Sequence, residues 1–223
     1  MTFTLDTPAG PVPARIEGEG PAGILLATGA GTGQDHPGVA GLRSRLAAAG
    51  AIVMTFEYAY RAAGRSSPDR PPRLLEVHRA AAARLREVVG DNLVLAGRSM
   101  GGRMATMLAA DDEPCRAVVV YGYPLHPAGK PEQLRVEHLP AVGVPMLLIT
   151  GTRDALALPA LVERHLAPLP TVTLQLVADA DHSFRRKGTR PEEMLDYLAE
   201  VTLAWLKRVE GLSGLADVAA DPQ

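Results

Sequence analysis

The chain has 223 residues, of which 47% are hydrophobic and 22% are charged, and its formal net charge is −2 at pH 7. These values are typical of an ordinary globular protein, and the near-neutral balance argues against a nucleic-acid-binding surface. Charged residues, glycine and proline interrupt every apolar run before it reaches the length of a membrane span. We therefore expect no nucleic-acid or membrane partner, and we place a single domain at residues 1–210 with a flexible tail at 211–223.

The N-terminal segment and the cysteine content indicate the cellular compartment. Residues 1–6 contain neither the basic segment nor the apolar stretch of a signal peptide. Cys115 is the single cysteine, so the chain cannot form an internal disulfide, which fits a reducing environment. The expected location is therefore the cytoplasm.

Short apolar runs alternate with segments of helical periodicity along most of the chain. The first two runs, 3–6 and 12–17, flank a Pro-Ala-Gly-Pro turn and predict a hairpin at the edge of a sheet. The other apolar runs predict strands at 23–28, 51–56, 92–96, 117–121, 145–150 and 172–177. Helical spacing predicts helices at 39–49, 74–88, 103–108, 159–166 and from about Thr189, with a capping box to Glu192, to Trp205. The segments 57–72 and 122–143 are expected to be loops.

This alternation of strands and helices indicates the fold class. It predicts an α/β protein with a doubly wound, mostly parallel sheet and helices on both faces. Open parallel sheets bind their ligands beyond the carboxyl ends of the strands. We therefore look for the site at the ends of the runs 92–96, 145–150 and 172–177.

The run 92–96 ends in Gly97-Arg98-Ser99-Met100-Gly101, the G-x-S-x-G pattern between a predicted strand and a predicted helix. A serine held on so sharp a turn needs neighbours without side chains, and Gly97, Gly101 and Gly102 meet that need. Ser99 would lie at the carboxyl edge of the sheet, with a helix N-terminus directed at it that stabilises negative charge. Taken alone, the pattern also fits an ordinary glycine-rich turn.

Two other strand ends carry the partners that a nucleophilic serine requires. Asp154 follows the run 145–150 and His182 follows the run 172–177, which gives the chain order of α/β hydrolases. His182 would take the proton of the Ser99 hydroxyl, and Asp154 would orient and stabilise the imidazolium. Asp179 and Asp181 compete with Asp154, but both are too close in sequence to His182 to come from a different strand.

Five further histidines occur, at positions 36, 78, 126, 138 and 165. His78 and His165 fall within predicted helices and follow no strand end, so they are poor candidates for the base. His36 and His126 lie on predicted loops near the site, where we expect them to line it.

An acyl-transfer site also needs hydrogen-bond donors for the tetrahedral oxyanion. The backbone N–H of Met100, at the start of the helix, is one candidate, and that of Ala30, after the run 23–28, is the other. The glycines of this second loop also suggest a dinucleotide site. That alternative is weak, because Gln34 replaces the last glycine of the fingerprint and only Glu57 supplies an acidic residue near the next strand end.

Several motifs together resemble a small α/β-hydrolase family described as dienelactone-hydrolase-like. They are Gly97–Arg103, Gly29-Ala30-Gly31, Phe56-Glu57-Tyr58 and Tyr121–Pro127, and the resemblance extends over residues 23–205. It implies an α/β-hydrolase core with Ser99, Asp154 and His182 as the triad. A eukaryotic branch of this family is a subunit of a histone-acetyltransferase complex.

Two departures from that family concern the site. Thr28 stands where the family loop usually has histidine, which puts the fine geometry of the oxyanion loop in question. Dienelactone hydrolases proper use a cysteine nucleophile, whereas this turn carries Ser99, so their substrate is not transferred to this chain.

The walls of the site follow from the same fold-level analogy. Only residues 122–144 separate two strands between which lid domains are often inserted, so we expect a minimal enzyme without a lid domain and with an open site. The substrate-binding candidates are Tyr58, Arg61, Arg98, Tyr123 and His126. The basic run 185–187 either attracts an anionic acyl group or, as we favour, forms a solvated face.

The sequence thus predicts a serine hydrolase of small carboxylic esters or thioesters that works through an acyl-serine intermediate. Two alternatives stay open: a non-catalytic interaction protein with this fold, and an acyltransferase that uses an alcohol or amine in place of water. No cofactor and no metal are expected, because no cluster of ligands has metal-binding spacing. The expected partner is a small ester or thioester substrate.

Overall fold

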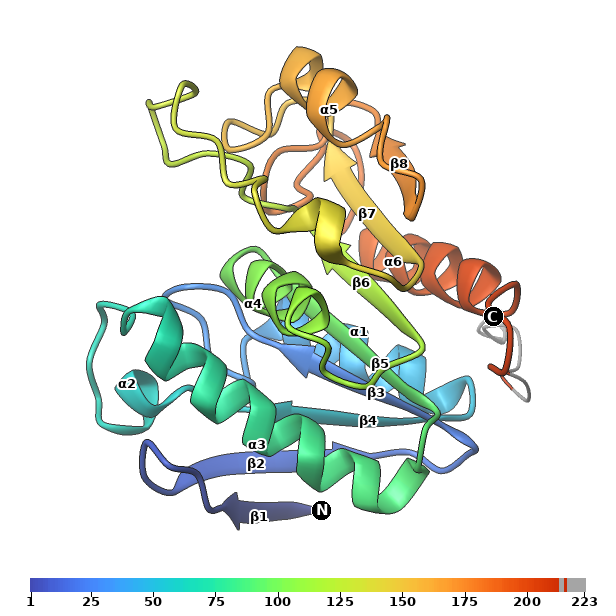
Figure 1. Ribbon diagram of the computed structural model, residues 1–223. Coiled ribbons are helices and arrows are strands. Elements are labelled where there is room, and N and C mark those ends of the chain that lie inside the picture. Colours follow the sequence, from blue (N-terminus) through green and yellow to red (C-terminus); the bar gives the residue numbers. More distant parts are fainter. Residues whose placement is uncertain (213–214, 216–223) are drawn as a thin grey trace.

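The computed structural model describes residues 1–212 and 215, and its centre is one eight-stranded sheet (Figure 1). The strand order across the sheet is β1-β2-β4-β3-β5-β6-β7-β8. The strands are β1 (Thr2–Leu5), β2 (Val12–Glu17), β3 (Ala22–Ala27), β4 (Ala51–Phe56), β5 (Leu93–Arg98), β6 (Ala117–Tyr121), β7 (Met146–Gly151) and β8 (Val172–Val177). β1 and β2 form the predicted edge hairpin, β2 pairs antiparallel with β4, and the pairs from β4 to β8 are parallel.

Helices cover both faces of this sheet, as the sequence predicted. The α-helices are α1 (Pro37–Ala48), α2 (Ala59–Ala62), α3 (Pro71–Val89), α4 (Met100–Ala110), α5 (Pro159–His165) and α6 (Pro191–Leu206). α1 and α6 pack together on one face, and α3 and α4 lie on the other (Figure 1). The protein therefore has an α/β-hydrolase fold with two buried layers of apolar side chains.

The two layers explain why the central strands read as uninterrupted apolar runs. In β3, Leu25 faces the layer under α3 and α4, whereas Ile24 and Leu26 face the layer under α1 and α6. All three side chains are fully buried. Because alternate residues of a strand point to opposite faces, a strand covered on both sides is apolar at nearly every position.

The structure differs from the sequence prediction mainly where helices are short or begin. The segment 57–72 is not entirely a loop, because it contains α2 and the first two residues of α3, which starts at Pro71. The segment 122–143 contains a 3₁₀ turn at Leu139–Ala141. The last helix begins at Pro191, and its cap is set by Glu193, whose carboxylate accepts a hydrogen bond from the Arg190 N–H.

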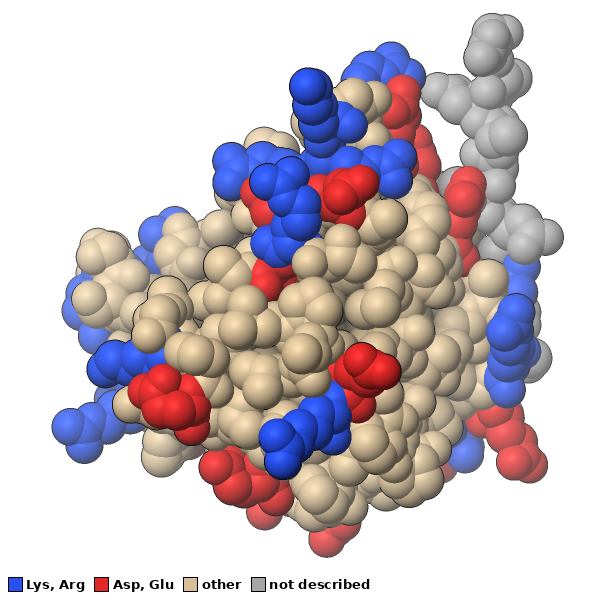
Figure 2. Space-filling view, turned by 90° about the horizontal axis from the view of Figure 1, so that it is seen from above, with Lys and Arg blue, Asp and Glu red and all other residues tan. Residues whose placement is uncertain are grey.

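The tail expected at 211–223 lies largely outside the described residues. Of its described members, Leu212 and Leu215 are buried against the layer formed with α6. Among the residues that the structure describes, no helix is long and apolar enough to cross a lipid bilayer. On the face drawn in Figure 2, basic and acidic side chains are interspersed around a broad area of other residues.

Candidate active site

The turn between β5 and α4 brings a serine to the carboxyl edge of the sheet. Ser99 has φ 48° and ψ −114°, a left-handed conformation that residues with a side chain rarely adopt. The turn is this tight because the glycines let strand and helix touch. A Cβ on Gly101 would lie 2.6 Å from the Thr28 carbonyl oxygen, and one on Gly97 would lie 2.5 Å from the Gly102 nitrogen.

The strand ends that carry the other candidate residues are level with this turn. In the sheet register Arg98 pairs with Tyr121, Tyr121 with Ile149, and Gly151 with Val177. The loops that leave β5, β7 and β8 therefore start at the same edge and can place side chains within hydrogen-bonding distance of one another.

The structure brings together the three side chains that the sequence singled out. His182 Nε2 lies 2.9 Å from Ser99 Oγ, and His182 Nδ1 lies 2.8 Å from Asp154 Oδ2. Because an ionised carboxylate only accepts hydrogen bonds, this contact puts the imidazole proton on Nδ1 and leaves the Nε2 lone pair for the serine hydroxyl. The Asp154 side chain is fully buried, and its Oδ1 accepts a second hydrogen bond from the Leu156 N–H at 2.7 Å.

Of the two competing carboxylates, that of Asp181 is engaged elsewhere. Asp181 accepts hydrogen bonds from the backbone N–H groups of Ser183 and Arg185 and pairs with the Arg185 guanidinium at 3.0 Å. Although partial burial opposes it, these hydrogen bonds and the charge of Arg185 lower the pKa of Asp181. Asp181 therefore shapes the loop that follows His182, and the contact with the imidazole is made by Asp154.

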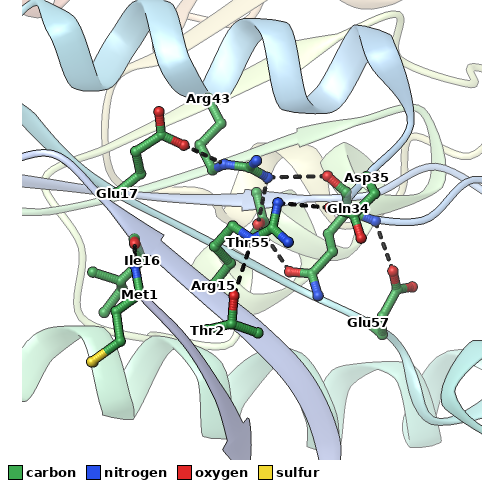
Figure 3. Close-up of polar contacts among 10 residues, drawn as sticks. All are labelled: Met1, Thr2, Arg15, Ile16, Glu17, Gln34, Asp35, Arg43, Thr55 and Glu57. Atoms are coloured by element: carbon green, nitrogen blue, oxygen red, sulfur yellow. Dashed lines mark hydrogen bonds and ion pairs between the residues drawn. The ribbon is translucent and has the colours of Figure 1, made fainter.

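A network of polar contacts fixes the loop between β3 and α1, which carries Ala30 (Figure 3). The Gln34 N–H donates to Glu57 at 2.7 Å, and the Gln34 carbonyl accepts from Arg43 at 3.0 Å. Arg43 also binds Glu17 at 2.8 Å and Thr55 at 3.1 Å, which ties the loop to β2 and β4. Such preorganisation is what an oxyanion site needs, because donors that are already in place cost no rearrangement during the reaction.

The two backbone groups assigned to the oxyanion lie in the same cavity as Ser99. This cavity has a volume of about 390 Å³, and its lining includes Ala30, Ser99 and Met100. The N–H groups of Ala30 and Met100 have no hydrogen-bond partner within the described part of the chain. The Met100 N–H belongs to the first turn of α4, where the positive end of the helix dipole favours an anion.

The predicted wall residues do not all reach this cavity. His126 lines it, together with Pro124 and Leu156 from neighbouring loops. Tyr58 and Tyr123 do not, because both are fully buried in the apolar layer under α3 and α4. Their hydroxyl groups have internal partners: that of Tyr58 lies 3.3 Å from His78 Nδ1, and that of Tyr123 donates to the Arg135 carbonyl at 2.6 Å.

Two predicted arginines also lie away from the Ser99 cavity. Arg98 lines a second cavity, of about 580 Å³, between α1 and α6. Burial lowers the pKa of its guanidinium, although the charge of Asp181 opposes this. Arg61 belongs to α2 and lines neither cavity. Of the basic run 185–187, Arg185 is paired with Asp181, and Arg186 donates to Thr189.

Sequence reasoning missed several residues that build the site. Tyr60 accepts a hydrogen bond from the Gly31 N–H at 3.4 Å. Arg43 donates a hydrogen bond to the Gln34 carbonyl in the same loop between β3 and α1. Arg103 and Arg135 line the Ser99 cavity itself. Arg103 directly follows the glycines of the turn, one helical turn beyond Ser99, and this spacing was the available signal. The others are brought to the site only by the packing of distant segments.

The single cysteine is not an alternative nucleophile. Cys115 lies just before β6, and burial raises the pKa of its thiol to about 12. It would therefore carry no thiolate at neutral pH, and it is absent from the lining of the Ser99 cavity. The candidate nucleophile that lines this cavity is the Ser99 hydroxyl.

Together, the fold and these contacts define the protein as an α/β hydrolase. A family model described as alpha/beta hydrolase domain matches residues 20–209, so the chain belongs to this family.

Solved structures of similar proteins have the same fold. An alpha-beta serine hydrolase homologue from Coxiella burnetii superimposes with a TM-score of 0.74 at 16% identity, over 92% of this chain and 97% of that one. A serine hydrolase without a lid from Xanthomonas campestris gives 0.70 at 22% identity, over 96% of both chains. A dienelactone hydrolase from Anabaena variabilis gives 0.73 at 21% identity, over 94% of this chain and 97% of that one.

Proposed function

We propose that the protein hydrolyses small carboxylic esters or thioesters through an acyl intermediate on Ser99. The observation that carries this proposal is the chain of contacts from Ser99 Oγ to His182 Nε2 at 2.9 Å and from His182 Nδ1 to Asp154 Oδ2 at 2.8 Å. A serine hydroxyl is a weak nucleophile at neutral pH and becomes a useful one when a base within hydrogen-bonding reach takes its proton. His182, oriented by Asp154, is such a base.

In the first half of the proposed reaction, Ser99 Oγ attacks the ester carbonyl carbon while its proton moves to His182 Nε2. The negative charge that develops on the carbonyl oxygen is stabilised by the N–H groups of Ala30 and Met100. When the tetrahedral intermediate collapses, the bond to the leaving alcohol or thiol breaks and His182 returns the proton to it. The acyl group then remains bound to Ser99.

In the second half, His182 Nε2 takes a proton from water, whose oxygen attacks the acyl carbon. The ester bond to Ser99 breaks, the serine recovers its proton from His182, and the carboxylic acid leaves. Asp154 remains ionised throughout and stabilises the imidazolium that forms in each half.

A fluorophosphonate probe tests this proposal, because it reacts with an activated serine and needs no knowledge of the natural substrate. We expect labelling and p-nitrophenyl acetate hydrolysis by the unmodified protein and by Ser66→Ala, an exposed serine outside the cavity. We expect neither from Ser99→Ala. Labelling that persists in Ser99→Ala, or none in the unmodified protein, would contradict the proposal.

A further inference from the structure

The cavity beside Ser99 is lined by two arginines that form no ion pair with a carboxylate among the described residues. Arg103, on α4, and Arg135, on the loop after β6, both line it. Arg103 makes no side-chain hydrogen bond or ion pair with any residue that the structure describes, and its Nε is inaccessible to solvent. Within the described residues, the side chain of Arg135 makes one hydrogen bond, a long one of 3.4 Å from NH1 to the Pro124 carbonyl.

The nearby carboxylates do not serve as counter-ions. Asp69 lines the same cavity, but it is paired with Arg65 at 2.7 Å and with Arg73 at 3.6 Å. Glu137 is exposed and forms no ion pair with either cavity arginine within the described structure. Arg103 and Arg135 therefore lie together, partly buried, in one cavity and form no ion pair with any residue that the structure describes.

A third group in the cavity can add a hydrogen bond. His126 Nδ1 lies 2.9 Å from the Pro127 carbonyl, which can only accept, so this nitrogen carries a proton. His126 Nε2 is buried and has no partner among the described residues. With its proton on Nδ1, the neutral imidazole leaves Nε2 as an acceptor for a donor group of the substrate.

The charge of Arg103 acts on its neighbours in this cavity wall. Burial, and then the charge of Arg103, lower the pKa of Arg135. Burial and Arg103 likewise lower the pKa of His138 to about 4. Partly buried like charges without a counter-ion are unfavourable, and an anion placed between them removes that cost.

We infer that the substrate of this hydrolase carries an anionic group, a carboxylate or a phosphate, which Arg103 and Arg135 bind while the ester carbonyl lies at Ser99. The planar guanidinium fork suits the paired oxygens of either group. This inference rests on the proposed ester hydrolysis. It adds that the two arginines of the cavity wall make the enzyme specific for anionic esters.

Matched pairs of esters test the inference. On the acyl side, p-nitrophenyl hydrogen glutarate is compared with neutral p-nitrophenyl valerate. On the alcohol side, 4-acetoxybenzoate and 4-acetoxyphenyl phosphate are compared with methyl 4-acetoxybenzoate. We expect kcat/KM to be at least about tenfold higher for the anionic member of one pair, and the pair that responds identifies the anion and its position.

Variants assign the preference to the two arginines. Arg103→Gln and Arg135→Gln should each lower the ratio of anionic to neutral kcat/KM by about 10- to 100-fold, whereas Arg103→Lys, which keeps the charge, should lower it less. Arg164→Gln, on the exposed side of α5, removes the same charge outside the cavity and should leave the ratio unchanged. A neutral ester preferred by the unmodified protein, or a ratio that Arg103→Gln and Arg135→Gln leave intact, would overturn the inference.

Binding separates this inference from the proposed function. Titration calorimetry of Ser99→Ala with p-nitrophenyl hydrogen glutarate and with 4-acetoxyphenyl phosphate measures affinity without turnover. Binding of either ester that Arg103→Gln weakens at least about tenfold supports the anion site even if Ser99 proves unreactive. Binding of neither ester, with normal fluorophosphonate labelling of the unmodified protein, would refute the anion site and leave the hydrolase proposal standing.

Discussion

The left-handed backbone at Ser99 leads to a prediction about stability that is opposite to the usual one. Replacing alanine with glycine at an ordinary position destabilises a protein by about 0.5–1 kcal/mol, because glycine loses more conformational freedom on folding. At Ser99, with φ 48°, a residue with a Cβ carries a strain of about 1–3 kcal/mol, and glycine relieves it. Ser99→Gly should therefore be more stable than Ser99→Ala by about 1 kcal/mol.

The difference in stability between these two variants measures the effect of the backbone conformation at position 99. Both lose the 2.9 Å contact between Ser99 Oγ and His182 Nε2, so that loss cancels in the difference. For a chain of this size, 1 kcal/mol corresponds to a difference of about 2–4 °C in Tm. Ala83→Gly, at an exposed position of α3, is the matched control and should lower the free energy of unfolding by about 1 kcal/mol relative to the unmodified protein.

Urea unfolding followed by circular dichroism, together with calorimetric Tm values, measures all of these variants. The reasoning predicts a higher midpoint for Ser99→Gly than for Ser99→Ala, with both inactive. The opposite result would be that Ser99→Gly is less stable than Ser99→Ala, by as much as Ala83→Gly destabilises the unmodified protein. In that case the turn stores no strain, and Ser99 would be held in place by its side-chain contacts alone.

Three further predictions concern the triad, the turn and a buried histidine. Asp154→Asn should keep the fold and lower kcat for p-nitrophenyl acetate by about 10⁴-fold, because the imidazole loses its orientation; a loss below tenfold would count against its role. Gly97→Ala would place a Cβ 2.5 Å from the Gly102 nitrogen and should destabilise by about 3 kcal/mol or more in urea unfolding, whereas Gly143→Ala, with no atom within 4 Å, should not. Burial lowers the pKa of His78 to about 3 in the folded protein, whereas the same imidazole has a pKa near 6.5 in the unfolded chain. The stability that comes from the neutral buried imidazole is therefore fully present above pH 6.5 and is lost as the pH falls from 6.5 towards 3. Between pH 6.5 and 4.5 this amounts to about 2 kcal/mol, and the fall should be smaller in His78→Gln; an equal fall in both would contradict it.

Much of the fold could be predicted from the sequence because apolar runs and helical spacing are local patterns. The strands at 51–56 and 117–121 have the bounds expected from their apolar runs, since burial on both faces favours a nearly continuous run. The strands at 12–17 and 172–177 also have the expected bounds, although polar and partly exposed residues alternate with apolar ones in them. The signals failed where local preference is weak: α2 has only four residues, and the start of α6 depends on Glu193 rather than on the expected pair of Thr189 and Glu192. Short helices and caps are decided by contacts that a periodic pattern does not contain.

The residues of the candidate site also fall into those that the sequence could predict and those that it could not. Ser99, Asp154 and His182 each follow a recognisable strand end, and the register of the sheet brings those ends level, so the sequence could group them before their distances were known. Tyr58 and Tyr123 show the limit of that reasoning. Both follow strands that end near the site. The direction of a side chain, however, depends on tertiary packing, and both side chains are buried in the apolar layer under α3 and α4.

The sequence by itself therefore determined the order of the elements, the glycine turn and the chain order of the three polar residues, because these depend on spacing and on the absence of side chains. The tertiary structure decided which charged groups line the cavity of Ser99. Arg103 and Arg135 are separated along the chain and become neighbours only when the loop after β6 folds over α4. Charge in a cavity depends on three-dimensional distance and on exclusion of water, and a linear pattern specifies neither.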